Sequence, residues 1–250
     1  MKCKFIISIL ALFVGVTHLK AQSGIITYTG HINKQYSEKF LKSLNDDKNT
    51  PADVLQTITL WHNTAKPVEL ELRFKGSESF YEFIPDLNSD GGYNISETLT
   101  GSYMPYYTNS KSNTIIEFNP FVGNTVIDQP LEWNITPEMK KIGKYNCIKA
   151  VAYEQRPSRK GGFFTDKVIA WFTTEIPVNF APRRYNGLPG LVLEVEKDRY
   201  IITATKIVLN PKKEVVLNVP EIGRTITQSE QYKRYEEREK ERQRERANQK

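Results

Sequence analysis

The chain has 250 residues, a net charge of +6, 39% hydrophobic residues and two cysteines. About 200 residues ahead of a charged end are enough for one domain with its own hydrophobic core, so a second domain is not required. The positive charge is not concentrated in this body. Three lysines lie in the first twenty residues and residues 229–250 hold eight Lys or Arg against six Glu, which leaves the body at about +1. This distribution argues against a surface that binds nucleic acid.

The first residues follow the plan of a secretory signal peptide. Lys2 and Lys4 precede an apolar run from Phe5 to Val16, and Ala21 is a small residue at the expected cleavage point. The run is shorter than the roughly 20 residues of a membrane-spanning helix, and no later stretch is comparable. We therefore expect residues 1–21 to be a signal peptide cleaved near Ala21, and the mature chain to be periplasmic or secreted without a transmembrane segment.

The body alternates between apolar and polar residues, which predicts strands at hairpin spacing with one early helix. The helix is expected over residues 37–44, where Phe40, Leu41 and Leu44 share one stripe. The pattern predicts a single mainly-β domain over residues 22–226, with a large curved antiparallel sheet that is half-barrel or sandwich-like. The expected strands are 24–29, 56–62, 68–74, 79–84, 114–118, 125–127, 131–135, 145–155, 167–174, 191–196, 199–209 and 215–219.

Two segments depart from this pattern. Residues 85–113 are rich in Gly, Asn, Ser, Thr and Tyr, and we expect a long loop there, either a binding surface or a poorly ordered excursion. Its candidate binding residues are Tyr93, Tyr103, Tyr106 and Tyr107. Residues 227–250 begin with a capping box and are then almost wholly charged, which predicts a helical or disordered tail, with partner binding by charge as the alternative.

Residues 187–192 read Gly-Leu-Pro-Gly-Leu-Val and predict a sharp corner followed by a strand. Pro189 and Gly190 suit the two central positions of a type II turn, in which Gly190 would adopt a positive φ. The corner carries no titratable group, so we interpret it as architectural.

These residues resemble the signature of the GLPGLI family of exported bacterial proteins, with Val192 in place of the final Ile. Residues 143–150 and 171–177 are similar to the other recurring segments of that family, in order and in approximate spacing. The resemblance implies an exported protein and brings no activity, cofactor or catalytic residue with it. The residues that carry it are Cys147, Trp171, Thr174, Pro177, Gly187, Leu188, Pro189, Gly190 and Leu191.

Candidates for chemistry are few. Cys147 is the one cysteine left after cleavage, so an intramolecular disulfide is impossible, and we expect a small buried hydrophobe in preference to a reactive thiol. With only His31 and His62 in the mature chain, the common Cys and His zinc sites cannot be assembled, and we expect no metal and no cofactor. A pairing of Cys147 with His62 has no local support in the sequence.

Two functions remain open. The first is a non-catalytic envelope protein that binds a partner protein or an apolar ligand. The alternative is a periplasmic hydrolase whose site is built from Cys147 or from the scattered carboxylates Glu154, Glu175 and Glu194, which flank the family segments. Because no catalytic constellation is visible, we assign no catalytic residue and favour binding.

Overall fold

The computed structural model describes residues 23–86, 92–121, 123–158 and 161–248, so the predicted signal peptide over residues 1–21 lies outside the described residues. Within them, the chain forms one 12-stranded sheet in the order β12-β6-β5-β4-β3-β2-β1-β11-β10-β9-β8-β7. The strands are β1 Ser23–Ile32, β2 Val68–Lys75, β3 Glu78–Ile84, β4 Tyr106–Asn109, β5 Thr114–Glu117, β6 Asn124–Val126, β7 Asn134–Ile142, β8 Tyr145–Pro157, β9 Phe163–Thr173, β10 Leu191–Lys197, β11 Tyr200–Leu209 and β12 Thr225–Thr227.

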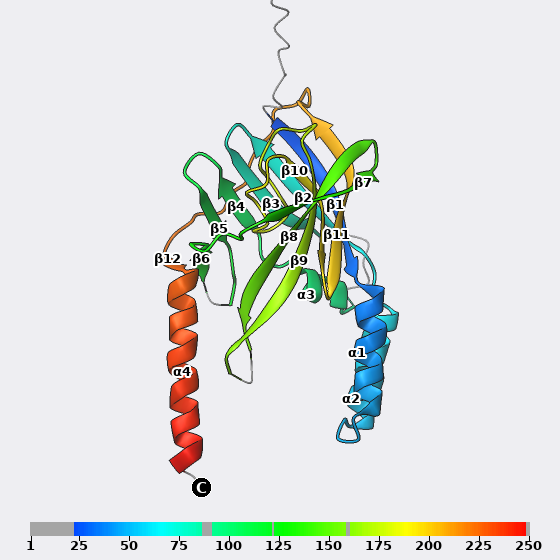
Figure 1. Ribbon diagram of the computed structural model, residues 1–250, viewed down its shortest axis with the longest axis vertical. Helices are drawn as coiled ribbons and strands as arrows, with labels where there is room; N and C mark the ends of the chain where they lie inside the picture. Colours follow the sequence, from blue (N-terminus) through cyan, green and yellow to red (C-terminus); the bar gives the residue numbers. More distant parts are fainter. Residues whose placement is uncertain (1–22, 87–91, 122, 159–160, 249–250) are drawn as a thin grey trace, which may run out of the picture.

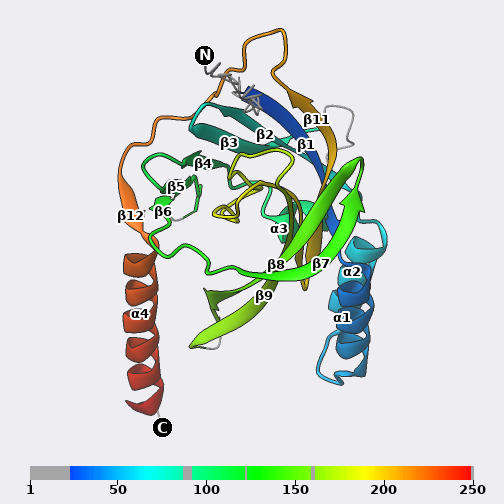
Figure 2. The same cartoon turned by 45° about the horizontal axis from the view of Figure 1, so that its top comes forward.

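The mainly-β prediction is confirmed, but the sheet is mixed. Every neighbouring pair is antiparallel except β12 and β6, which are parallel. The order ends at β12 and β7, so the sheet is not closed. Figures 1 and 2 show it strongly curved, with α1 (Lys34–Asp46) and α2 (Ala52–Asn63) projecting at one side and α4 (Gln228–Asn248) at the other.

Alternation along β2 shows why the sheet forms here. Val68, Leu70, Leu72 and Phe74 are buried, while the residues between them are more exposed. These side chains join Ile26 and Tyr28 of β1, Tyr106 of β4 and Leu193 of β10 in the main core. A second core lies between β8, β9, β10 and the loop before β10, and includes Phe172, Tyr185, Leu188 and Val192.

The strand predicted over residues 56–62 is wrong, because this segment belongs to α2. Pro51 precedes the helix and Asp53 lies in its first turn, both of which favour a helix start. The helix returns along α1, where the hydroxyl of Ser37 lies 2.7 Å from Nδ1 of His62. As a result, β2 pairs with β1 and β3, and the predicted hairpin loop over residues 63–67 instead connects α2 to β2.

The segment over residues 85–113 contains more regular structure than the predicted loop. Helix α3 (Ile95–Thr100) begins at Asn94, whose side chain accepts a hydrogen bond from the amide of Ser96, and ends at Gly101 with a φ of 65°. Strand β4 follows and pairs with β3 and β5. The short lengths of both elements explain why periodicity did not reveal them.

Two other predicted strands are placed elsewhere. Leu131 precedes β7, which begins at Asn134 and continues to Ile142, and residues 215–219 form no strand. The sheet instead ends with β12, three residues long, and leads directly into α4. Among the described residues, no helix has the length and apolar character needed to cross a membrane.

Candidate binding site

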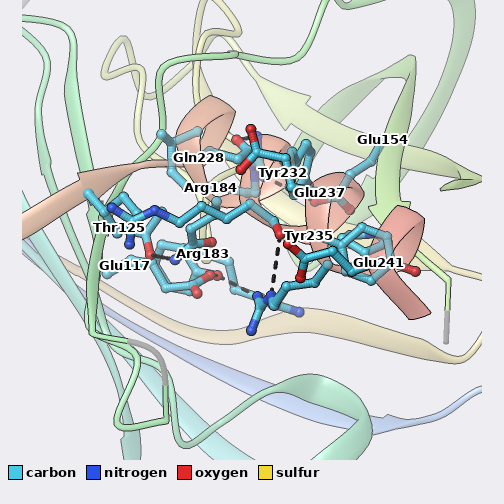
Figure 3. Close-up of a pocket in the computed structure, with 17 residues that line it drawn as sticks. Glu117, Thr125, Glu154, Arg183, Arg184, Gln228, Tyr232, Tyr235, Glu237 and Glu241 are labelled. Carbon is cyan, nitrogen blue, oxygen red and sulfur yellow. Dashed lines mark hydrogen bonds and ion pairs between the residues drawn. The ribbon is translucent and has the colours of Figure 1, made fainter. Parts of the chain in front are cut away.

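A cavity of about 750 Å³ lies between the sheet and α4 (Figure 3). Its walls come from β4, β5 and β6, from the end of β8, from the loop between β9 and β10, and from α4. The volume lies within the usual range for small-molecule sites. The lining residues are Tyr106, Glu117, Thr125, Ile127, Glu154, Pro157, Arg183, Arg184, Ile226, Gln228, Gln231, Tyr232, Arg234, Tyr235, Glu237, Arg238 and Glu241.

Arg183 lies on the loop between β9 and β10 in an unusual backbone conformation. Its φ is 56°, and the other two non-glycine residues with a positive φ in the described part of the chain are both asparagines. Asparagine tolerates this region, whereas for an arginine it costs about 1–2 kcal/mol. Strain of this kind is often retained at functional sites.

The guanidinium of Arg183 is held by phenols and not by a carboxylate. Its Nη1 donates to the Tyr200 hydroxyl at 2.8 Å, and its Nη2 donates to the Tyr106 hydroxyl at 3.4 Å. Its Nε is buried and has no hydrogen-bond partner, and no carboxylate oxygen lies within 4.0 Å, among the described residues. Arg183 therefore presents a positive charge without a directly paired carboxylate.

The phenols around Arg183 form a chain of hydrogen bonds. Tyr106 donates to the carboxylate of Glu117, and the hydroxyls of Tyr185 and Tyr200 lie 2.7 Å apart. Burial raises the pKa of Tyr106 well above its usual value; Arg183 opposes this and Glu117 adds to it. Tyr106 therefore stays protonated at neutral pH and remains a donor.

Arg184, the next residue, is deeply buried and better neutralised. Its side chain is 8% exposed, and Nη1 lies 3.5 Å from Glu154 on β8. Nη2 donates to the Gln129 carbonyl at 2.9 Å and to Oε1 of Gln228 at 2.7 Å, whereas Nε is buried and lacks a partner among the described residues. Burial raises the pKa of Glu154, but the positive charges of Lys197 and Arg184 outweigh burial. The pKa of this carboxyl therefore lies below its usual value.

The wall formed by α4 is attached through a small set of contacts near its start. Tyr232 donates to the Gln155 carbonyl at 2.8 Å, and Tyr235 donates to the Ser158 carbonyl. The ring of Phe163 packs against Tyr232, with centroids 5.2 Å apart. Beyond Tyr235 the helix is mostly exposed and charged.

The predicted corner at residues 187–190 fixes the loop that carries Arg183. Leu188 is buried in the second core, and the amide of Leu191 donates to the Ile176 carbonyl at 3.1 Å. Asn186 accepts from the Ala181 amide at 2.9 Å and donates to the Arg183 carbonyl at 3.4 Å. The corner therefore positions the arginines of the cavity.

The positive φ predicted for Gly190 is wrong. The positive φ belongs to Gly187, at 100°, and not to Gly190. A Cβ on Gly190 would lie 2.1 Å from the carbonyl oxygen of Thr173, so this position needs glycine because two backbone segments approach closely.

The other residues that carry the sequence resemblance lie apart from the cavity. Cys147 is fully buried in the main core, and burial raises the pKa of its thiol to about 11. Trp171 donates from Nε1 to Glu196 at 2.8 Å and is covered by Lys140, whose Nζ lies 4.2 Å from the ring centroid. Thr174 and Pro177 are exposed.

Of the four tyrosines predicted to form a binding loop, only Tyr106 lines the cavity. Tyr93 packs against Trp61 and Tyr103 against Phe121, both at exposed positions. Tyr107 donates to Glu78 on the neighbouring strand. The prediction therefore identified one site residue, but as part of a loop and not of a strand.

The three candidate carboxylates occupy separate environments. Glu154 reaches the cavity, Glu175 accepts from the amide of Asn146 at 2.8 Å, and Glu194 pairs with Lys140. His62 is engaged with Ser37 between α1 and α2, whereas Cys147 lies on β8. Within the described ranges, no group of three His, Cys, Asp or Glu residues could hold a metal ion.

Arg183 and Arg184 were missed by sequence reasoning. The signal was an Arg-Arg pair, beginning four residues before Gly187, in a loop with no other charged residue between Pro177 and Gly187. The contribution of α4 was also missed, since its charged sequence predicted a tail and not a wall of a cavity.

Comparison with known proteins finds one family model that matches a short part of the chain. A family described as "Protein of unknown function (Porph_ging)" matches residues 163–194. This range spans β9, the arginine loop and the start of β10. No curated protein matches the chain.

Four chains among the solved structures match. One is described as "Structure of PNGF-II in P21 space group", with 15% sequence identity and a TM-score of 0.46. The match covers 86% of this chain and 33% of the PNGF-II chain, so this chain spans about a third of that protein.

Proposed function

We propose that this chain is a non-catalytic binding protein of the cell envelope and that it holds a small polar ligand between the sheet and α4. Its resemblance to the GLPGLI family of exported proteins supports the proposed location. The observation that carries the proposal is the cavity of about 750 Å³, whose lining includes four arginines and four glutamates beside apolar surface. Such a lining favours a polar ligand over the apolar ligand expected from the sequence, because an apolar molecule would leave buried polar groups unpaired.

The hydrolase alternative has less support. A nucleophilic thiol needs a lowered pKa or an adjacent base, whereas the pKa of Cys147 is raised by burial. Glu154, Glu175 and Glu194 have different partners and do not form among themselves the pair of carboxylates that glycoside hydrolysis uses. Binding without turnover is the simpler use of these residues.

The test is to purify the tagged mature protein from the cell envelope and to analyse its bound molecules by native mass spectrometry. We expect a small polar molecule bound at one copy per chain. Gln231→Trp should displace it, because Gln231 lines the cavity and indole would fill part of the space. Gln243→Trp is the matched control, since Gln243 lies on the exposed part of the same helix.

Recovery of a lipid or a protein whose binding is unchanged in Gln231→Trp would contradict the proposal. Conversion of the bound molecule to a product by the wild type, but not by Gln231→Trp, would favour the hydrolase instead.

A further inference from the structure

We infer that the ligand carries a carboxylate monoanion that binds at Arg183. This inference rests on the proposed function, and it names the group by which the ligand is recognised. It begins from the Nε atoms of two consecutive arginines. Both atoms are buried and unpartnered in the described part of the chain, and both side chains line the cavity.

The charges around the two arginines differ. Arg184 is neutralised by Glu154, which also pairs with Lys197, and Lys197 in turn lies 3.4 Å from Asp166. Arg183 has phenols as its partners and no carboxylate within 4.0 Å among the described residues. Glu117 reaches Arg183 only through the Tyr106 hydroxyl, so this partly buried guanidinium has no directly bound anion, and an anion in the cavity would supply one.

The single positive charge of Arg183 indicates which class of anion fits. A carboxylate supplies one negative charge and matches the planar fork of a guanidinium with two oxygens. The lining of the cavity carries four glutamates and four arginines, so a phosphate near neutral pH would bring up to two negative charges into a site that is formally neutral. A monoanion disturbs this balance less than a dianion does, which favours the carboxylate.

The surroundings of Arg183 hold its guanidinium in place before any ligand arrives. Tyr200 and Tyr106 bind its two terminal nitrogens, and Asn186 binds its backbone carbonyl. Because the side chain is fixed in this way, little conformational entropy is lost when an anion binds. The left-handed backbone of Arg183 is consistent with a residue retained for its position.

The experiment is calorimetric titration of the full mature protein at constant ionic strength with N-acetylglycine, with its neutral analogue N-acetylglycinamide and with inorganic phosphate. We expect saturable binding of N-acetylglycine and at least tenfold weaker binding of the other two. Arg183→Gln should weaken N-acetylglycine binding at least tenfold, and Arg183→Lys, which keeps the charge but loses the fork, should be intermediate. Arg224→Gln removes an exposed arginine that does not line the cavity and should leave binding unchanged.

Three outcomes would overturn the carboxylate assignment. These are equal binding of acid and amide, tighter binding of phosphate, and absence of saturable binding of N-acetylglycine. A polar ligand that co-purifies with wild type, is displaced in Gln231→Trp and is retained in Arg183→Gln would leave the proposed function intact and contradict only this inference. Circular dichroism of Arg183→Gln and Arg183→Lys verifies that both variants are folded.

Discussion

The two walls of the cavity differ in how firmly they are held. On the sheet side, Tyr106 and Arg184 are buried and tied into hydrogen-bond networks that reach across several strands. On the α4 side, the paired residues Arg234 and Glu230 are 56% and 50% exposed. The helix is attached through side chains of its first two turns, namely Gln228, Gln231, Tyr232 and Tyr235.

This difference in attachment indicates that the two walls have different roles. A rigid, partly dehydrated wall can hold a charge in a fixed position at low entropic cost. A solvated helix with few anchors opens locally at a much lower free energy than the sheet. We therefore expect the sheet to supply recognition and α4 to control access, and the following predictions test this from the largest effect to the smallest.

The largest loss of folding stability is expected for Gly190→Val, on the sheet side of the cavity. The new Cβ would lie 2.1 Å from the Thr173 carbonyl oxygen, so two backbone segments must separate. We expect a loss of about 3 kcal/mol or more in the free energy of unfolding, measured in urea. Gly187→Ala is the matched control: its Cβ meets nothing closer than 3.9 Å and only the positive φ is strained, so the loss should be about 1 kcal/mol. Equal losses in both variants would contradict the account of Gly190.

The buried charges of the same wall are tested by Glu154→Gln. This change leaves Arg184 without its carboxylate, while Lys197 keeps Asp166. We expect a loss of about 2 kcal/mol, below the ~3–5 kcal/mol found when fully buried pairs are broken. Glu138→Gln breaks a pair with Lys149 in which the Glu138 side chain is 59% exposed, and it should cost no more than about 1 kcal/mol.

The pH dependence of stability gives a second measure of Glu154. Its pKa is lower in the folded protein than its usual value of 4.5, so its contribution is fully present above pH 4.5 and is lost as the pH falls through the folded pKa. Unfolding curves from pH 6 down to about pH 3 should therefore show a smaller decline in Glu154→Gln than in wild type. Equal declines would indicate that other carboxyl groups dominate.

Packing within the sheet is tested at Cys147. Cys147→Ala should cost about 1–2 kcal/mol through a small cavity. Because burial raises the pKa of this thiol to about 11, a bulky thiol reagent should label the native protein very slowly at pH 8. A cysteine introduced by Gln243→Cys on α4 is the internal control and should react within the same sample at the rate of an exposed thiol. Comparable rates at both sites would contradict a closed core.

The smallest global effect is expected from Tyr235→Ala, which removes one anchor of α4. We expect less than about 1 kcal/mol in global unfolding, because the sheet retains its core. Hydrogen exchange of residues 236–248 should become distinctly faster, while exchange in β8 and β9 stays unchanged. If the sheet also exchanges faster, α4 is an integral part of the fold and not a separate, weakly held wall.

The sequence predicted the strands best where alternation is long. Residues 68–74, 145–155 and 200–209 all lie in strands, because the period of two is clear over segments of this length. It failed for α2, where Pro51 and Asp53 signalled a helix start that the alternation over residues 56–62 obscured. The sequence also did not predict β12, because a strand of three residues is too short to show an alternating pattern.

The candidate site was much less predictable. Glu154 and Tyr106 were identified, but as a scattered carboxylate and as a loop residue. Arg183 meets Tyr200 and Tyr106 only through the long-range pairing of the sheet, which no local pattern specifies. For the same reason the approach of α4 to β8 and β9 depends on tertiary contacts of Tyr232 and Tyr235.

The most direct test of the central claim is to observe the Nε–H group of Arg183 by nitrogen-15 NMR, with Arg183→Lys used to assign its signal. During titration with N-acetylglycine, this signal should shift saturably and its exchange with water should slow, whereas the signal of the exposed Arg224 should not change. N-acetylglycinamide should produce neither effect at Arg183. If N-acetylglycine shifts only the signals of exposed arginines and leaves Arg183 unchanged, the cavity does not recognise its ligand through this residue and the account is wrong.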